Sequence, residues 1–453
     1  MSVIGGPLRL ADPLRLATDA SDETMLASTA QGLVTFDAQG RITPGLAERW
    51  IITSDGLSII FRIRRAQWGD NTLATGRQVA EHLRAITGPG SKHPMAPLFA
   101  NVSAIIAMTG QVVEMRLRVP QPELLQLLAH PDMAIFHLRA SQGTGPFRVH
   151  SIRAGVTRLR PVPDQNLEEP EDRGQRDDIR LRGESAAIAV ARFQAREISL
   201  VTGGTFSDLA LARAARPATS QFQIDPVFGL FGLAVSRGSK PLADASVRRA
   251  IAMAIDRDRI VLGFGVNSWV TAYSVLPAQL DSSARPAALE WVQLPFPDRI
   301  ARAKALLNGK NLPTVRVALP AGTGGRLLFA ELAADWRKIG IQAVQVGLAS
   351  PADMRLIDEV APQSAAFWYL HRLSCARGLP CDPVIEAGIN AVKTAKSATE
   401  RSEAIAGVDA RLAEEQLFIP IALPLRWSLV NTNLTAWRPN AFAAHPLGKL
   451  RRN

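Results

Sequence analysis

The sequence predicts a mixed α/β protein with more than one domain and more than one sheet. The chain has 453 residues, which exceeds the size that one hydrophobic core usually supports, so two or more domains are expected. Segments with strand periodicity and segments with helix periodicity alternate in both halves of the chain, as in α/β and α+β proteins. The sequence has no apolar run long enough to cross a membrane as a helix.

The first half contains two segments in which apolar and more polar residues alternate. Residues 57–63 and 113–119 follow this period of two, which predicts strands with one buried face. A shorter strand is expected over residues 33–36, and a short helix over 121–129. Between the two alternating segments, Thr75 is placed as the N-cap of a helix. The apolar face of this helix is formed by Val79, Leu83 and Ile86.

The second half is richer in helices. Asp244 and Asp256 are expected to cap two consecutive helices, because a carboxylate can accept hydrogen bonds from the first free backbone N–H groups. Further elements are expected as helices starting from Asp298, from Thr323 and over residues 399–415, and as strands over residues 341–346 and 419–430.

Residues 161–182 form the most polar stretch of the chain and are dense in Asp, Glu, Arg and Pro. We interpret this stretch as a surface excursion and not as a linker between domains. An apolar helix and strand, residues 186–201, follow it directly, and a core therefore continues beyond it.

The net charge of +11 at pH 7 does not indicate a nucleic-acid-binding protein. Such proteins concentrate cations on one face and interleave them with aromatic residues. Here the basic residues are spread along the chain and aromatic residues make up only 6%. A generally basic surface that attracts anions or an anionic membrane is the simpler interpretation.

The two cysteines, Cys375 and Cys381, lie close together in the sequence. They could form a disulfide in an oxidising compartment, or they could be two free thiols. A metal site would need more ligands nearby, and only His371 is local, so no metal is expected.

The sequence offers no catalytic motif. The seven histidines are scattered, and no Gly-x-Ser-x-Gly elbow is present. The glycine-rich segments at residues 143–145 and 322–325 lack the Gly-Lys-Ser/Thr ending of a phosphate-binding loop and are interpreted as tight turns. We therefore expect neither an enzyme nor a bound cofactor.

Several segments, in this order, carry a family resemblance. They are residues 32–40, 44–50, 55–57, 61–64 and 68–70, Gly143-Thr-Gly-Pro-Phe147, residues 193–201, Val247-Arg-Arg-Ala-Ile-Ala-Met-Ala-Ile-Asp-Arg257, residues 338–341 and residues 437–440. In these segments the chain resembles the family 5 extracellular solute-binding proteins, the receptor components of peptide, nickel and opine ABC importers. Each segment alone is weak, but together they cover nearly the whole chain.

The resemblance implies a two-lobed periplasmic-binding-protein-like fold of the larger peptide-binding type, with the ligand cleft between the lobes. The first lobe would comprise residues 1–234, with residues 431–453 returning to it and residues 45–140 forming a sub-domain. The second lobe would comprise residues 235–430. Closure of the lobes about a hinge would couple ligand binding to a change of shape that a transporter can sense.

The function implied is that of the substrate-binding protein of an ABC importer that captures a small polar ligand, a short or modified peptide. Its partners would be the ligand and the permease subunits, with no nucleic acid, and the protein would be a periplasmic monomer. Residues 1–16 show no signal peptide. The signal could have been removed, the start could be misassigned, or the protein could stay inside the cell. A non-transport intracellular or sensory ligand-binding module is therefore the alternative, with a cytoplasmic location.

The resemblance also suggests where the ligand binds. The aromatic and basic cluster of residues 367–372 lies where the cleft wall of the family is expected. Peptide receptors of this type place an Asp shortly after a Trp, and alignment on Trp368 puts His371 at that position. A histidine that carries at most a positive charge would repel the amino terminus of a peptide. The candidate ligand-binding residues are Thr29, Gln31, Trp269, Tyr273, Phe367, Trp368, Tyr369, His371 and Arg372. The simpler alternative for the cluster is a strand with a buried aromatic face and a solvated basic one.

Overall fold

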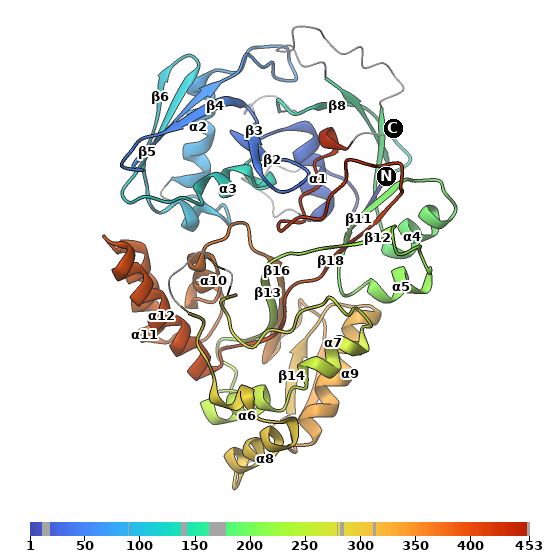
Figure 1. Ribbon diagram of the computed structural model, residues 1–453, viewed down its shortest axis with the longest axis vertical. Helices are drawn as coiled ribbons and strands as arrows, with labels where there is room; N and C mark the ends of the chain where they lie inside the picture. The colour runs from blue at the N-terminus through green and yellow to red at the C-terminus, as the bar shows by residue number, and fades with distance from the viewer. Residues whose placement is uncertain are drawn as a thin grey trace. The chain divides into compact units, whose positions relative to one another are not determined.

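The computed structural model describes residues 1–10, 19–88, 90–136, 143–162, 178–278, 280, 285–310 and 314–450. The chain divides into two compact units, each built around its own sheet (Figure 1). The first unit contains residues 1–204, 211–226 and 426–453, and the second contains residues 205–210 and 227–425. The main crossings at 226/227 and 425/426 lie just before strands β13 and β18, whereas the predicted boundaries lie at the far ends of the same two strands.

The large sheet of the first unit brings together segments from both ends of the chain. Its seven strands lie in the order β12 (Phe222–Asp225), β18 (Arg426–Val430), β11 (Leu200–Gly204), β1 (Ser2–Ile4), β10 (Ile179–Glu184), β9 (Val156–Pro161) and β8 (Phe147–Arg153). β1 pairs in parallel with β10 and β11, and the other neighbours are antiparallel. The C-terminal part of the chain is thus held in the same sheet as residues 2–4.

The predicted surface excursion at residues 161–182 is wrong at its end, where β10 begins. Residues 163–177 of that stretch lie outside the described residues. Residues 179–182, however, belong to a strand of the main sheet, in which Leu181 is fully buried. The strand was missed because its Arg residues at positions 180 and 182 continue the polar composition of the preceding segment while the apolar face of β10 packs into the core.

A smaller antiparallel sheet of the first unit lies within residues 45–140. Its order is β4 (Ala47–Ile52), β5 (Ser58–Ile63), β7 (Val112–Leu117) and β6 (Val102–Thr109), and helix α2 (Gly76–Thr87) packs on β6 and β7 (Figure 1). The alternation predicted for β5 is confirmed, since Ile59, Phe61 and Ile63 are buried. Thr75 caps α2 as predicted, because its hydroxyl accepts a hydrogen bond from the backbone N–H of Gln78 at 3.3 Å.

The remaining elements of the first unit are short helices, strands and turns. They are α1 (Ala20–Thr29), β2 (Val34–Phe36), β3 (Ile42–Pro44), the 3-10 turns Ala96–Phe99, Pro131–Met133 and Leu447–Lys449, α3 (Leu124–Ala129) and α4 (Ala186–Gln194). α5 (Leu209–Ala214) lies at the crossing between the units. The Asp19 carboxylate begins α1 by accepting a hydrogen bond from the backbone N–H of Asp22 at 2.9 Å.

The second unit is built on a five-stranded sheet. The order is β15 (Gln342–Val346), β14 (Thr314–Ala318), β16 (Met354–Val360), β13 (Gly229–Val235) and β17 (Phe418–Ala422). β14 is parallel to both of its neighbours, and β13 is antiparallel to both of its own. Every residue of β13 is buried, which explains its continuous apolar sequence.

Helices complete the second unit. They are α6 (Ala245–Met253), α7 (Arg257–Gly263), α8 (Phe296–Leu307), α9 (Thr323–Arg337), α10 (Ala366–Arg372), α11 (Pro383–Thr394) and α12 (Ala398–Glu415), with 3-10 turns at Glu290–Gln293 and Cys375–Arg377. Asp244 and Asp256 cap α6 and α7 as predicted. The predicted cap at Asp298 is wrong, because α8 already begins at Phe296. The predicted cap at Thr323 is also wrong, because the cap position of α9 is Gly322.

The predicted strand over residues 419–430 is two strands in two different units. β17 belongs to the sheet of the second unit and β18 to the large sheet of the first, with residues 423–425 between them. The mixed α/β architecture with several sheets is as predicted. No helix in the described part of the chain is both long and apolar enough to span a membrane.

Candidate functional site

The first unit contains a pocket formed by three parts of the chain. α1 contributes Glu23 and the residues after it contribute Gln31. The turn that follows α3 contributes His130, and a C-terminal segment contributes His445. Much of the remaining wall is made of small apolar side chains, namely Ala27, Ala30, Ala129, Ala134, Ala443 and Ala444.

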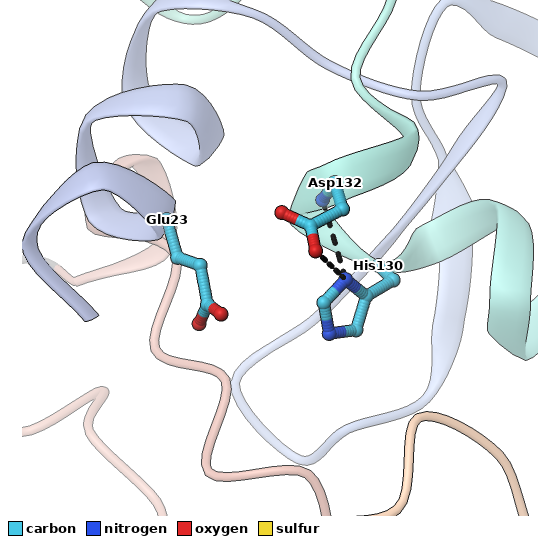
Figure 2. A group of neighbouring side chains, drawn as sticks. All are labelled: Glu23, His130 and Asp132. Atoms are coloured by element: carbon cyan, nitrogen blue, oxygen red, sulfur yellow. Dashed lines mark hydrogen bonds and ion pairs between the residues drawn. The ribbon is translucent and has the colours of Figure 1, made fainter. Parts of the chain in front are cut away.

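Glu23 and His130 line this pocket, which we call the acidic pocket, and Asp132 lies directly beside them. Glu23, His130 and Asp132 each place a polar atom within 4.8 Å of the others, and the Glu23 side chain extends towards the histidine ring (Figure 2). His130 Nδ1 accepts a hydrogen bond from the backbone N–H of Asp132 at 3.2 Å, and the Asp132 carboxylate lies 3.8 Å from the same nitrogen. Since Nδ1 is the acceptor, the neutral ring carries its proton on Nε2.

The environment of the acidic pocket disfavours charge on Glu23 and on His130. Burial, together with the nearby Asp132, raises the pKa of Glu23 to about 8, although Arg426 acts in the opposite direction. Burial also lowers the pKa of His130, again against the effect of Asp132. Within the described residues, the Glu23 carboxylate has neither a hydrogen bond nor an ion pair. At neutral pH the ligand-free pocket therefore holds a protonated Glu23 and an uncharged His130.

The two candidates from the first unit have different surroundings. Thr29 is fully buried and its hydroxyl donates to the carbonyl of Met25 at 2.8 Å, which is a structural role at the end of α1. Gln31 lines the acidic pocket, and its side-chain amide donates to the carbonyl of Thr144 at 2.7 Å. Gln31 is therefore held in place at the pocket wall.

A second pocket lies in the second unit, between the beginning of β13, the end of β17 and residues 270–278. Tyr273 lines it, and the Arg257 guanidinium lies 4.6 Å from the centre of the Tyr273 ring. Trp269 is a core residue instead. It is buried, its indole N–H donates to the carbonyl of Leu423 at 2.7 Å, and its ring packs on Phe231 and Phe264.

The aromatic and basic cluster forms helix α10 and not a strand. Phe367, Trp368 and Tyr369 are buried, with Trp368 and Tyr369 in edge-to-face contact at 4.8 Å. The Arg372 guanidinium pairs with both carboxylate oxygens of Glu359, at 2.7 and 2.6 Å. The positive charge of Arg372, which was predicted to contact a ligand, is therefore paired within the protein.

His371 is neutral, whereas the sequence suggested that it could carry a positive charge and repel the amino terminus of a peptide. Its ring stacks on Phe367 at 5.8 Å. Burial, reinforced by Arg377 and Lys393, lowers the pKa of His371 to about 4. Repulsion between a cationic His371 and the amino terminus of a peptide therefore does not operate at neutral pH. The residue still lacks the negative charge of an aspartate.

Cys375 and Cys381 are joined by a disulfide, with their Cα atoms 4.8 Å apart. The bridge lies directly after α10 and before α11, and the backbone N–H of Cys375 also donates to the Glu386 carboxylate at 2.6 Å. The short loop between the two cysteines is thus fixed at both of its ends.

Replacement of both cysteines by serine is expected to lower the free energy of unfolding by about 2 kcal/mol, because the unfolded chain regains the freedom of a short loop. Urea denaturation of the oxidised protein and of the Cys375→Ser/Cys381→Ser variant measures the difference. A reducing agent should produce the same loss in the wild-type protein and none in the variant. Equal stability of all the samples would contradict the prediction.

Sequence reasoning missed the acidic pocket. His130 and Asp132 form only a short His-x-Asp pattern, and Glu23 lies on a helix more than a hundred residues earlier. Pairing of Gln31 with Ile135 and packing of α1 on the turn at residues 131–133 bring the three side chains together. No spacing rule within one segment could have connected them.

Comparison with known proteins agrees with the predicted resemblance. Residues 41–357 match the family described as bacterial extracellular solute-binding proteins, family 5, middle. The chain is 23% identical to the probable di/tripeptide-binding protein 5 of Pseudomonas aeruginosa, over 99% of this chain and 98% of that protein. It is also 23% identical to the probable ABC transporter periplasmic-binding protein SapA of Escherichia coli, over 93% of this chain and 86% of that protein.

Solved structures show the same fold. The chain is similar to OppA of Haemophilus influenzae in complex with the peptide RPPGFSPFR, with a TM-score of 0.84, 16% identity and coverage of 100% of this chain and 98% of that one. The murein tripeptide binding protein MppA of Escherichia coli gives a TM-score of 0.82 at 16% identity, over 100% of this chain and 97% of that one. The predicted fold of the larger peptide-binding type is thereby confirmed. The chain belongs to the bacterial extracellular solute-binding proteins of family 5.

Proposed function

We propose that this protein is the substrate-binding component of an ABC importer and captures a small polar ligand, a short or modified peptide. The observation that carries the proposal is the similarity over nearly the full length of both chains to a probable di/tripeptide-binding protein. The name of OppA, an oligopeptide-binding protein, supports the same class of ligand, and the names of OppA and SapA support a periplasmic location. No relative among these suggests the intracellular or sensory alternative.

The ligand contacts that we propose come from both units. Gln31 and Tyr273 each line a pocket of the structure, and we assign them to the binding surface. Trp368 and His371 on α10 stay in the proposed set because of the family resemblance. In this proposal the two units close around the ligand as a monomer, the permease subunits recognise the closed form, and the ligand leaves chemically unchanged.

Titration of the purified protein with a panel of peptides, opines and free amino acids tests the proposal. We expect one class of short peptide to raise the melting temperature and to bind with a measurable Kd by calorimetry. Gln31→Ala should weaken binding. Gln223→Ala removes a similar side-chain hydrogen bond to a backbone carbonyl at an exposed position and should not. A panel without a single binding peptide, or cleavage of a bound peptide detected by mass spectrometry, would contradict the proposal.

A further inference from the structure

The acidic pocket contains more hydrogen-bond acceptors than the protein satisfies. The Glu23 carboxylate has neither a hydrogen bond nor an ion pair among the described residues, and a carboxylate oxygen of Asp132, which has other interactions of its own, lies within 4.8 Å of it. His445, whose side chain is 6% exposed, lines the same pocket. Its Nε2 lies 3.1 Å from the Asp225 carboxylate, and its buried Nδ1 has no hydrogen-bond partner in the described part of the chain. In a neutral ring whose Nε2 proton is directed to Asp225, Nδ1 is one more acceptor.

The geometry of His130 argues for an organic cation and against a metal ion. A metal ligated by Nε2 needs that nitrogen free of its proton. Here Nδ1 already accepts the Asp132 backbone N–H, so the neutral ring keeps its proton on Nε2. An ammonium nitrogen about 2.8 Å from each of two carboxylate oxygens fits oxygens that are at most 4.8 Å apart.

The wall of the pocket suits an aliphatic chain that ends in a charge. The alanines on α1 and in the C-terminal segment leave an apolar surface without competing donors. Phe36, which stacks on Phe442 at 4.4 Å, adds a rigid aromatic face. A methylene chain can pack on such a wall while its nitrogen reaches the carboxylates.

We propose that the acidic pocket binds a positively charged nitrogen group of the ligand, an ammonium or a guanidinium, between Glu23 and Asp132. This proposal rests on the proposed function, because it defines which peptides the protein prefers. The group can come from a lysine or arginine side chain or from the amino terminus of the peptide.

A bound cation favours the ionised form of Glu23, which the surrounding residues disfavour. Without ligand, Asp132, the N-cap residue Asp19 and Asp22 on α1 all disfavour the negative charge of Glu23, and Arg426 favours it. His130 is neutral, and His445 pairs with Asp225. An added ammonium supplies the missing positive charge, and Glu23 then releases its proton to solvent. Proton release on binding is therefore a signature of this site.

Calorimetry with tri-lysine and with agmatine, each in buffers of different ionisation enthalpy, tests the proposal. We expect Glu23→Gln and Asp132→Asn to weaken the binding of both probes by about tenfold or more. The wild-type protein should release a proton at neutral pH, and Glu23→Gln should not. Glu197→Gln, which changes an exposed carboxylate of the same unit that pairs with Arg192, is the matched control and should bind like the wild type.

Two acetylated forms of tri-lysine identify the source of the cation. Acetylation of the side chains should remove the dependence on Glu23 if a side chain enters the pocket, and acetylation of the amino terminus should remove it if the terminus does. Equal affinity of the wild type and Glu23→Gln for every probe would overturn the inference, as would tight binding of Zn²⁺ or Ni²⁺ alone that requires Glu23. Failure of tri-alanine and of all other peptides to bind, with agmatine still bound through Glu23, would instead contradict the proposed function alone.

Discussion

Replacement of Arg257 by methionine is expected to lower the free energy of unfolding by about 3–5 kcal/mol. Arg257 is fully buried, and its guanidinium donates to the carbonyls of Ala272 at 3.1 Å, Pro420 at 2.8 Å and Ala252 at 3.2 Å. Methionine fills much of the same volume but leaves these buried carbonyls without donors, and hydrogen bonds to a charged group are among the stronger ones in proteins.

Arg257 also connects the start of α7 to two other parts of the second unit. Pro420 belongs to β17, and Ala272 belongs to the segment that carries Tyr273. Burial lowers the pKa of Arg257 to about 10, so the side chain is still charged at neutral pH. In the described residues no carboxylate forms an ion pair with it, and backbone carbonyls and the rings of Tyr273 and Trp291 surround the charge.

Urea denaturation followed by circular dichroism measures the expected loss. Arg249→Met is the control, since the Arg249 side chain is partly exposed, at 36%, and pairs with the exposed carboxylate of Glu414, and it should change stability by less than about 1 kcal/mol. Arg257→Lys should fall between the wild type and the methionine variant, because an ammonium cannot reach all the carbonyls that the planar guanidinium reaches. Similar stability of Arg257→Met and Arg249→Met would refute this role.

Helix caps and strand alternation could be predicted from the sequence, because each depends on residues that are close together in the chain. Thr75, Asp244 and Asp256 cap helices because their side chains accept backbone N–H groups only two or three residues away. The alternation of β5 could be read for the same reason. Residues 419–430, in contrast, read as one apolar strand. That β17 and β18 join different sheets depends on β11, β12 and β13, which are far away in the sequence.

The candidate site shows the same limit. Trp269 and Tyr273 are close in sequence and chemically alike, but Trp269 packs in the core and Tyr273 lines a pocket. The charge of His371 could not be read either, because burial and the cations around it set its pKa. For Glu23, the sequence shows a carboxylate near the start of a helix, which is a favourable and ordinary position. Only the fold places Asp132 and His130 beside it.

Replacement of Glu23 by glutamine is expected to stabilise the ligand-free protein at alkaline pH. The pKa of Glu23 is raised from 4.5 to about 8 in the folded protein. Below about pH 4.5 the residue is protonated in both the folded and the unfolded chain and contributes nothing. As the pH rises from there to about 8, only the unfolded chain loses the proton, so the wild type becomes progressively less stable. Above about pH 8 the loss is complete.

Glutamine lacks this loss. Since the pKa differs by about 3.5 units and each unit corresponds to about 1.4 kcal/mol, the gain should be on the order of 5 kcal/mol above pH 8. Thermal melts of the wild type and of Glu23→Gln from pH 4 to pH 9 measure it, and Glu197→Gln should show no comparable gain. A difference that does not grow with pH would contradict the prediction. A carboxylate that weakens the ligand-free fold at the pH where it ionises is a poor structural element, which is why its position in a pocket points to a ligand that supplies the opposite charge.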